Sequence, residues 1–190
     1  IDTNGKTLTR NQSIITTGGT LTIEGSGTIY CNEDTATIRS RGGNITVSDK
    51  PTIRGVNNTI NTLVDTSGEV NINGGYFYST GRSGIGLYGN GDANISSAYV
   101  YTPVKDKNAI YVGDGSTSKV TITSSTVGNG TKNSSGINPS TTVSSALSYS
   151  STGNLTINNS KILGGPYAAN AITVYNRRSI NLTGCTSLYT

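Results

Sequence analysis

The chain has 190 residues and a mass of 19.6 kDa, which is the size of one domain with its own core. Only 13% of the residues are charged, the net charge is +4, and the 32% apolar share together with 25 glycines excludes a disordered chain. The absence of His excludes imidazole metal ligands, imidazole acid–base catalysis and any Ser–His or Cys–His nucleophile.

The composition also limits the partners. The basic residues are scattered, with Arg177-Arg178 as their only adjacent pair, so we expect no nucleic-acid partner. No apolar run approaches the ~20 residues of a membrane helix, so we expect no membrane insertion. The chain begins at Ile1 without Met or a charged-then-apolar leader, which predicts a mature or excised piece of a protein with further domains.

Residues 1–17 come before a regular repeat and are less regular than it, with Leu8, Ile14 and Ile15 as apolar positions. We expect this segment to be an N-terminal cap on the open end of the first repeat, because an uncovered solenoid end invites edge pairing.

From residue 18 onward, an apolar–polar–apolar triplet recurs about every 25 residues, and further apolar residues follow each triplet. The triplets are Leu21-Thr22-Ile23, Ile45-Thr46-Val47, Val70-Asn71-Ile72, Ala93-Asn94-Ile95, Val120-Thr121-Ile122, Leu155-Thr156-Ile157 and Ile180-Asn181-Leu182. The second apolar positions are Ile29, Ile53, Phe77, Val100, Val127, Ile162 and Leu188, and the third are Ile38, Leu63, Ile85, Ile110, Leu147 and Ile172. Each period therefore predicts three short strands separated by Gly, Asn and Ser turns.

Three strands per period, repeated in register, predict that residues 18–190 wind as a solenoid of about seven coils. Each strand then pairs with its equivalent one coil later, about 4.8 Å away. The main alternative is an antiparallel sandwich of hairpins, with Asn73-Gly74 as a tight turn. The equivalent stretch one coil later, Ser96-Ser97-Ala98, lacks such a turn although the flanking pattern persists, which favours a corner shared by successive coils.

The triplets and two further stretches carry a family resemblance. Together with Asn108-Ala109-Ile110-Tyr111-Val112 and Asn170-Ala171-Ile172-Thr173-Val174, they resemble the right-handed parallel β-helix of the pectin-lyase-like superfamily. More narrowly, the chain is similar to Gly/Thr/Asn/Ser-rich tracts of Gram-positive bacterial cell-surface proteins. The resemblance implies an all-β, right-handed parallel β-helix in an extracellular or cell-wall-attached bacterial protein.

The resemblance does not select a function, because the superfamily spans lyases, hydrolases, epimerases, phage spikes and adhesins. The Asn-Thr-Asp, Asp-Asp and His-Gly motifs of polygalacturonases are absent from the chain. The Arg-x-Pro-x-x-Arg motif and the clustered calcium aspartates of pectate lyases are also absent. We therefore expect no cofactor and no metal.

Two local features depend on the solenoid. The interval between Ile122 and Ile157 is about ten residues longer than the others, which predicts an exposed loop insertion at about 128–142. Cys31 and Cys185 fall in the first and seventh coils, roughly 29 Å apart, so we expect both thiols to be free. The pattern stops in mid-coil after Leu188, and we expect the natural protein to continue.

Aligning the coils leaves one acidic pair, Glu69 and Asp92, each three residues before the end of its triplet. Stacked in neighbouring coils, their carboxyls would lie ~5 Å apart, a spacing compatible with a retaining glycosidase or a calcium site. The interpretation we favour is a solvated charged edge, in which Lys119 at the same position one coil later offsets the charge.

The outward positions of the second strands are rich in tyrosine, and alignment of the coils places these residues in two columns. The predicted columns are Tyr76–Tyr99 and Tyr30–Arg54–Tyr78–Tyr101. A flat row of tyrosines suits sugar recognition, because the ring faces contact C–H edges and the hydroxyls hydrogen-bond. Arg54 adds a cation–π layer or a contact to the carboxylate of an acidic sugar. Alternatively, the rings only stabilise the strand ladder, or a neighbouring domain covers them.

These observations predict a non-catalytic, adhesin-like surface module that binds a glycan or a host-surface receptor. The candidate ligand-binding residues are Tyr30, Arg54, Tyr76, Tyr78, Tyr99 and Tyr101. One alternative is a polysaccharide-degrading enzyme, a glycoside hydrolase or lyase, with Glu69 and Asp92 as catalytic candidates. A second alternative is a purely structural spacer between domains.

Overall fold

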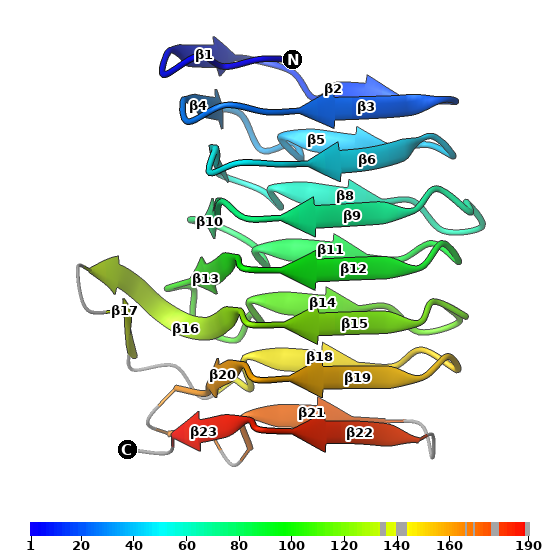
Figure 1. Ribbon diagram of the computed structural model, residues 1–190, viewed down its shortest axis with the longest axis vertical. Helices are drawn as coiled ribbons and strands as arrows, with labels where there is room; N and C mark the ends of the chain where they lie inside the picture. Colours follow the sequence, from blue (N-terminus) through cyan, green and yellow to red (C-terminus); the bar gives the residue numbers. More distant parts are fainter. Residues whose placement is uncertain (134–135, 140–143, 166, 169, 176–178, 189–190) are drawn as a thin grey trace.

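The computed structural model describes the whole chain except residues 134–135, 140–143, 166, 169, 176–178 and 189–190. Within the described part, the chain forms no helix and winds as a parallel β-solenoid whose coils stack into a rod (Figure 1). Each strand of a coil pairs in parallel with its equivalent in the next coil, for example β9 with β12. This pairing confirms the predicted solenoid and excludes the antiparallel sandwich.

Three sheets run along the rod. The triplet sheet contains β3 (Thr20–Ile23), β6 (Asn44–Val47), β9 (Val70–Asn73), β12 (Ala93–Ser96), β15 (Val120–Thr123), β19 (Leu155–Asn158) and β22 (Ile180–Thr183). The tyrosine sheet contains β1 (Thr7–Arg10), β4 (Thr28–Cys31), β7 (Thr52–Gly55), β10 (Tyr76–Ser79), β13 (Tyr99–Thr102), β16 (Thr126–Asn133), β20 (Lys161–Leu163) and β23 (Thr186–Leu188), with β17 (Gly136–Pro139) paired to β16. The short-strand sheet contains β2 (Ile14–Thr16), β5 (Ile38–Ser40), β8 (Ile60–Thr62), β11 (Ile85–Leu87), β14 (Ile110–Val112), β18 (Leu147–Tyr149) and β21 (Ile172–Val174).

The core is one continuous column of apolar side chains between the three sheets. In β10, for example, Phe77 is fully buried while Tyr76 and Tyr78 on either side are half-buried, because successive side chains of a strand point to opposite faces. The prediction of Leu63 as a core residue is wrong. Ile60 occupies that position, fully buried in register with the short strands before and after it, and Leu63 lies in the turn after β8. The corner before the short strand varies in length, so spacing alone does not distinguish the two residues.

A left-handed corner follows every triplet. The residue two positions after each triplet has a positive φ in every coil, and these residues are Gly25, Asp49, Gly74, Ser97, Ser124, Asn159 and Gly184. The corner predicted from Asn73-Gly74 and Ser96-Ser97-Ala98 is therefore shared by successive coils. Glycine adopts this backbone freely, and short polar side chains tolerate it better than most others.

Residues 1–17 continue the stack. β1 pairs in parallel with β4, and β2 pairs in parallel with β5. Leu8 is 37% exposed, in register with the buried Ile29, whereas Ile14 is half-buried against the core. This segment therefore adds one strand to the tyrosine sheet and one to the short-strand sheet.

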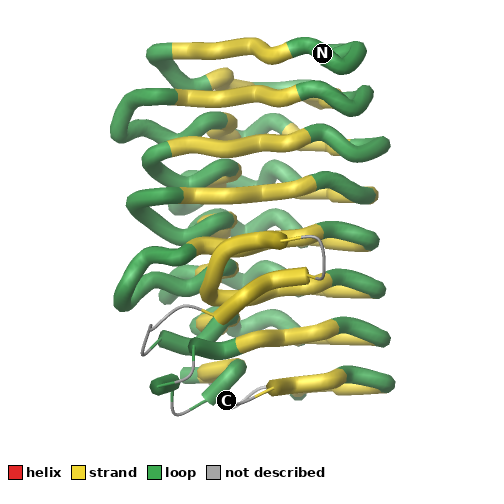
Figure 2. The backbone as a smooth tube through the Cα atoms, turned by 90° about the vertical axis from the view of Figure 1, so that its left-hand side faces the viewer, coloured by secondary structure: helices red, strands yellow, loops and turns green. Residues whose placement is uncertain are grey.

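The expected loop insertion at 128–142 contains a β-hairpin. β16 runs beyond its coil and pairs antiparallel with β17, and the hairpin projects in front of the tyrosine sheet (Figure 2). Exposure was expected throughout, but Gly128, Asn129 and Ile137 are buried, because the hairpin folds back against the coil from which it leaves. Residues 134–135 and 140–142 of the expected insertion lie outside the described residues.

The cysteine prediction is confirmed: both thiols are free. Cys31 is fully buried on β4, whereas Cys185 is partly exposed in the turn between β22 and β23.

Candidate functional site

The tyrosine sheet brings the predicted aromatic residues together on its outward side. Tyr76 pairs with Tyr99 in register, and their ring centroids lie 5.4 Å apart at an interplanar angle of 26°. Tyr78 pairs with Tyr101, with centroids 4.7 Å apart and an angle of 31°. All four side chains are half-buried, so each ring is supported by the sheet and also meets solvent.

The same outward column continues toward the N-terminus with a cation. Arg54 lies between Tyr30 and Tyr78 in register, and its guanidinium carbon is 4.2 Å from the centroid of the Tyr30 ring. The Arg54 side chain is exposed, so its guanidinium stacks on an aromatic face while remaining open to a ligand. The sequence-based register of Tyr30, Arg54, Tyr78 and Tyr101 is the register of the structure.

Tyr101 is the most perturbed ionisable group of this face. Burial raises its pKa to about 12, the neighbouring Tyr78 and Tyr76 hydroxyls act in the same direction, and the Arg54 cation opposes them. The Tyr101 hydroxyl therefore remains protonated at neutral pH and can both donate and accept a hydrogen bond.

The hairpin closes one side of the tyrosine face. Lys132 on β16 places its Nζ atom 4.5 Å from the Tyr76 ring centroid and 5.2 Å from that of Tyr99. The next position after Tyr101 in its column is Gly128, over which Ile137 of β17 packs. The face is therefore a shelf that is open along Arg54 and Tyr78 and bounded by the hairpin. Sequence analysis did not assign this role to Lys132, because the contact depends on how the hairpin folds.

The acidic pair lies at the start of the triplet sheet. Glu69 and Asp92 occupy equivalent positions in neighbouring coils, since Val70 pairs with Ala93. The Asp92 Oδ1 atom accepts a hydrogen bond of 2.9 Å from the backbone N–H of Lys119, one coil later. Asn44 makes the same contact to the backbone N–H of Glu69. The Asp92 and Asn44 side chains therefore connect neighbouring coils, a role that an amide fills as well as a carboxylate.

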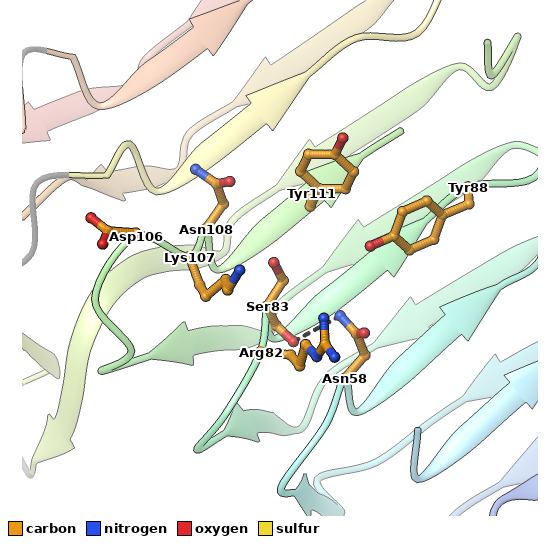
Figure 3. Close-up of a pocket in the computed structure, with 8 residues that line it drawn as sticks. All are labelled: Asn58, Arg82, Ser83, Tyr88, Asp106, Lys107, Asn108 and Tyr111. Carbon is orange, nitrogen blue, oxygen red and sulfur yellow. Dashed lines mark hydrogen bonds between the residues drawn. The ribbon is translucent and has the colours of Figure 1, made fainter. Parts of the chain in front are cut away.

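A hollow of about 280 Å³ lies on the short-strand side of the rod (Figure 3). The rings of Tyr88 and Tyr111 form one wall, with centroids 5.4 Å apart and an interplanar angle of 43°. Arg82 and Lys107, from the corners that precede β11 and β14, contribute two cations to the opposite side. We call this hollow, with these four residues, the corner groove.

Burial shapes the chemistry of Tyr88 in the corner groove. It raises the pKa of the Tyr88 phenol, the nearby Tyr111 hydroxyl adds to the shift, and the Arg82 cation opposes it. At neutral pH the groove therefore presents a neutral phenol beside the positive charge of Arg82.

Sequence analysis missed the corner groove, although one signal was present. Tyr111 follows Tyr88 by the same interval that separates Tyr76 from Tyr99. The register partner of Tyr111 is Gly86, whereas Tyr88 lies just beyond the end of β11. An alignment by strand positions alone therefore does not pair the two rings.

Among the described residues, no group of three or more Cys, Asp or Glu side chains is arranged to hold a metal ion. The described residues also include no helix of the length and hydropathy that crossing a bilayer requires.

The class that the fold defines is the parallel β-solenoid, with an aromatic face on one sheet and a groove beside another. No protein-family model, curated protein or solved structure matches the chain, so these comparisons assign it to no family within that class.

Proposed function

We propose that the protein is a non-catalytic carbohydrate-binding module that holds a glycan on the tyrosine face. The observation that supports this proposal is the two columns of paired tyrosine rings, in which the tilted Tyr78 and Tyr101 rings lie 4.7 Å apart beside the exposed Arg54. Neighbouring aromatic rings held on a rigid sheet contact the C–H faces of sugar rings with little loss of side-chain entropy.

The geometry supports binding better than catalysis. The Asp92 carboxylate, one of the two candidate catalytic groups, already accepts a backbone hydrogen bond from the next coil. The tyrosine face contributes hydroxyl groups, aromatic rings and the Arg54 guanidinium, which recognise a ligand without providing an acid–base pair.

We further propose an adhesin-like role at the surface of a bacterium, with a glycan of a host surface as the partner. This part rests on the resemblance of the sequence to cell-surface tracts of Gram-positive bacteria and to pectin-lyase-like β-helices. A rod of stacked coils is suited to displaying a binding face away from a wall.

The experiment is a glycan array followed by calorimetry on the best glycan. Tyr78→Ala and Tyr101→Ala should each weaken binding about tenfold, which corresponds to about 1.4 kcal/mol, because each removes one of the two rings of the pair. Tyr167→Ala is the matched control, since Tyr167 is 69% exposed and lies outside the face, and it should leave the affinity unchanged. Thermal unfolding of each variant separates lost binding from lost structure. An array without any bound glycan, or equal affinities for the Tyr78 and Tyr101 variants and the parent, would contradict the proposal.

A further inference from the structure

The corner groove carries a net positive charge. Arg82 and Lys107 both line it, and within the described part of the chain neither cation forms an ion pair or donates a side-chain hydrogen bond. Asp106 lies beside Lys107 in the chain and also lines the hollow, yet it pairs with neither cation. With two cations and one carboxylate among its described lining residues, the hollow keeps a net positive charge, which favours an anionic ligand.

Two glycines allow the Tyr88 ring, which forms part of the aromatic wall of the groove, to pack closely against the backbone. A Cβ atom at Gly86 would lie 2.8 Å from the Tyr88 ring, and one at Gly113 would lie 2.9 Å from it. Both positions therefore leave room for the ring only because they have no side chain. The Tyr88 ring is held against the sheet, and its tilted contact with Tyr111 gives the groove a fixed aromatic surface.

Two oriented amides complete the groove. The Asn58 Nδ2 atom donates a hydrogen bond of 3.0 Å to the carbonyl oxygen of Ser83, and the Asn108 Nδ2 atom donates one of 2.6 Å to the carbonyl oxygen of Ser145. These bonds fix the amides, and Figure 3 shows the oxygen of Asn108 on the side of Tyr111. Fixed amide oxygens and phenol groups are suited to the hydroxyls of a sugar.

We propose that the corner groove binds a sugar residue that carries a carboxylate. The Arg82 guanidinium and the Lys107 ammonium hold the carboxylate, the Tyr88 and Tyr111 rings contact the sugar ring, and the amide oxygens accept its hydroxyls. The volume of about 280 Å³ lies just below the ~300–1,000 Å³ of sites for drug-sized ligands, which suits a single sugar ring. This site is separate from the tyrosine face, because it lies over a different sheet.

The groove continues along the rod on the other side of Tyr111. A second hollow of about 310 Å³ shares Asn108 and Tyr111 with the first and is also lined by Asp114 and Tyr175. Among the residues that the structure describes, no Lys or Arg lines this second hollow, so we place the carboxylate in the first one and a neutral sugar in the second. A longer glycan would therefore lie parallel to the rod axis.

The test is an NMR titration of the 190-residue protein with three probes: methyl glucuronide, methyl glucoside and glucose 6-sulfate. Methyl glucuronide should bind at least about tenfold more tightly than methyl glucoside and shift the backbone amides around Arg82 and Lys107. Arg82→Gln should remove this preference, because it removes the charge and keeps a polar, unbranched side chain. Arg41→Gln, at an exposed arginine elsewhere, is the matched control and should retain it.

Three results would overturn the assignment. Equal affinity for glucuronide and glucoside, or no shift with glucuronide at tens of millimolar, would exclude an acidic-sugar site. Unchanged glucuronide affinity in a folded Arg82→Gln variant would exclude the corner groove. If glucose 6-sulfate bound more tightly than methyl glucuronide, the groove would be a site for a sulfated sugar and not for a sugar with a carboxylate. Tyr78→Ala should leave glucuronide binding in the groove intact, so failure of the tyrosine face and failure of this site are distinguishable.

Discussion

At the scale of single residues, burial raises the phenol pKa of three tyrosines in different parts of the fold. Tyr101 packs on Tyr78, and burial raises its pKa to about 12. Tyr88 and the fully buried Tyr149 are shifted in the same direction, mainly by burial. A phenol that holds its proton more tightly in the folded state links stability to pH in the alkaline range.

The first prediction concerns that linkage. In the unfolded chain Tyr101 loses its proton near the ordinary pKa of 10.0, whereas in the folded protein it does so near 12. Its contribution to stability is therefore complete below pH 10 and decreases as the pH rises toward 12. Tyr101→Phe should reduce the loss of unfolding free energy between pH 8 and pH 11, measured by urea unfolding. Tyr167→Phe, at an exposed position, should lose as much unfolding free energy over this pH range as the parent protein does. An identical loss in the Tyr101→Phe variant would contradict this assignment.

At the scale of elements, the left-handed corner after each triplet closes the coil and sets the spacing to the next one. Gly74 has a φ of 99°, and a Cβ atom there would lie 2.0 Å from the carbonyl oxygen of Asp49 in the preceding coil. Gly115 has a φ of 81° but would meet no atom within 4 Å. The two glycines therefore share a backbone conformation and differ in the contact between coils.

The second prediction uses this pair. Gly115→Ala should destabilise the protein by about 1 kcal/mol, which is the strain of a positive φ alone. Gly74→Ala should cost about 2 kcal/mol more, because the corner must also move away from the preceding coil. The measurement is the free energy of unfolding in urea for both variants. Equal losses would show that the coils do not constrain the corner.

The sequence predicted the elements that the repeat controls. The triplets align the register from Leu21 to Leu182, since each side chain of the triplet sheet pairs with its equivalent one coil later. The tyrosine columns follow from the same register. Elements outside the repeat were harder to predict. The position of Lys132 depends on a hairpin that no other coil contains, and Tyr88 lies beyond the end of its strand.

At the scale of the whole molecule, each coil contacts only its neighbours, so stability is distributed along one dimension. The central coils pack on both sides, and residues such as Phe77 and Val100 are fully buried. The coil of β22 packs on one side only, and Leu182 is 54% exposed there. Local unfolding should therefore begin at the ends of the stack.

The third prediction is a gradient of protection against hydrogen exchange. In the 190-residue protein, the amides of β9, β12 and β15 should exchange most slowly and those of β22 most rapidly. Mass spectrometry of exchanged peptides measures this difference. Phe77→Ala should remove about 3–5 kcal/mol of stability, as for large core residues, whereas Leu182→Ala should change it little. Uniform protection along the rod would contradict this distribution.

The hairpin of β16 and β17 shows that extra residues can be inserted into one coil of the rod. β16 pairs in parallel with β13 on one side and with β20 on the other, although its strand then leaves the coil to meet β17. The extra residues of the hairpin therefore do not disturb the parallel pairing of β16 with the strands of the preceding and following coils. Foreign peptides grafted in place of the hairpin tip would be displayed beside the tyrosine face, so this corner is a natural attachment point for engineering new specificities onto the rod.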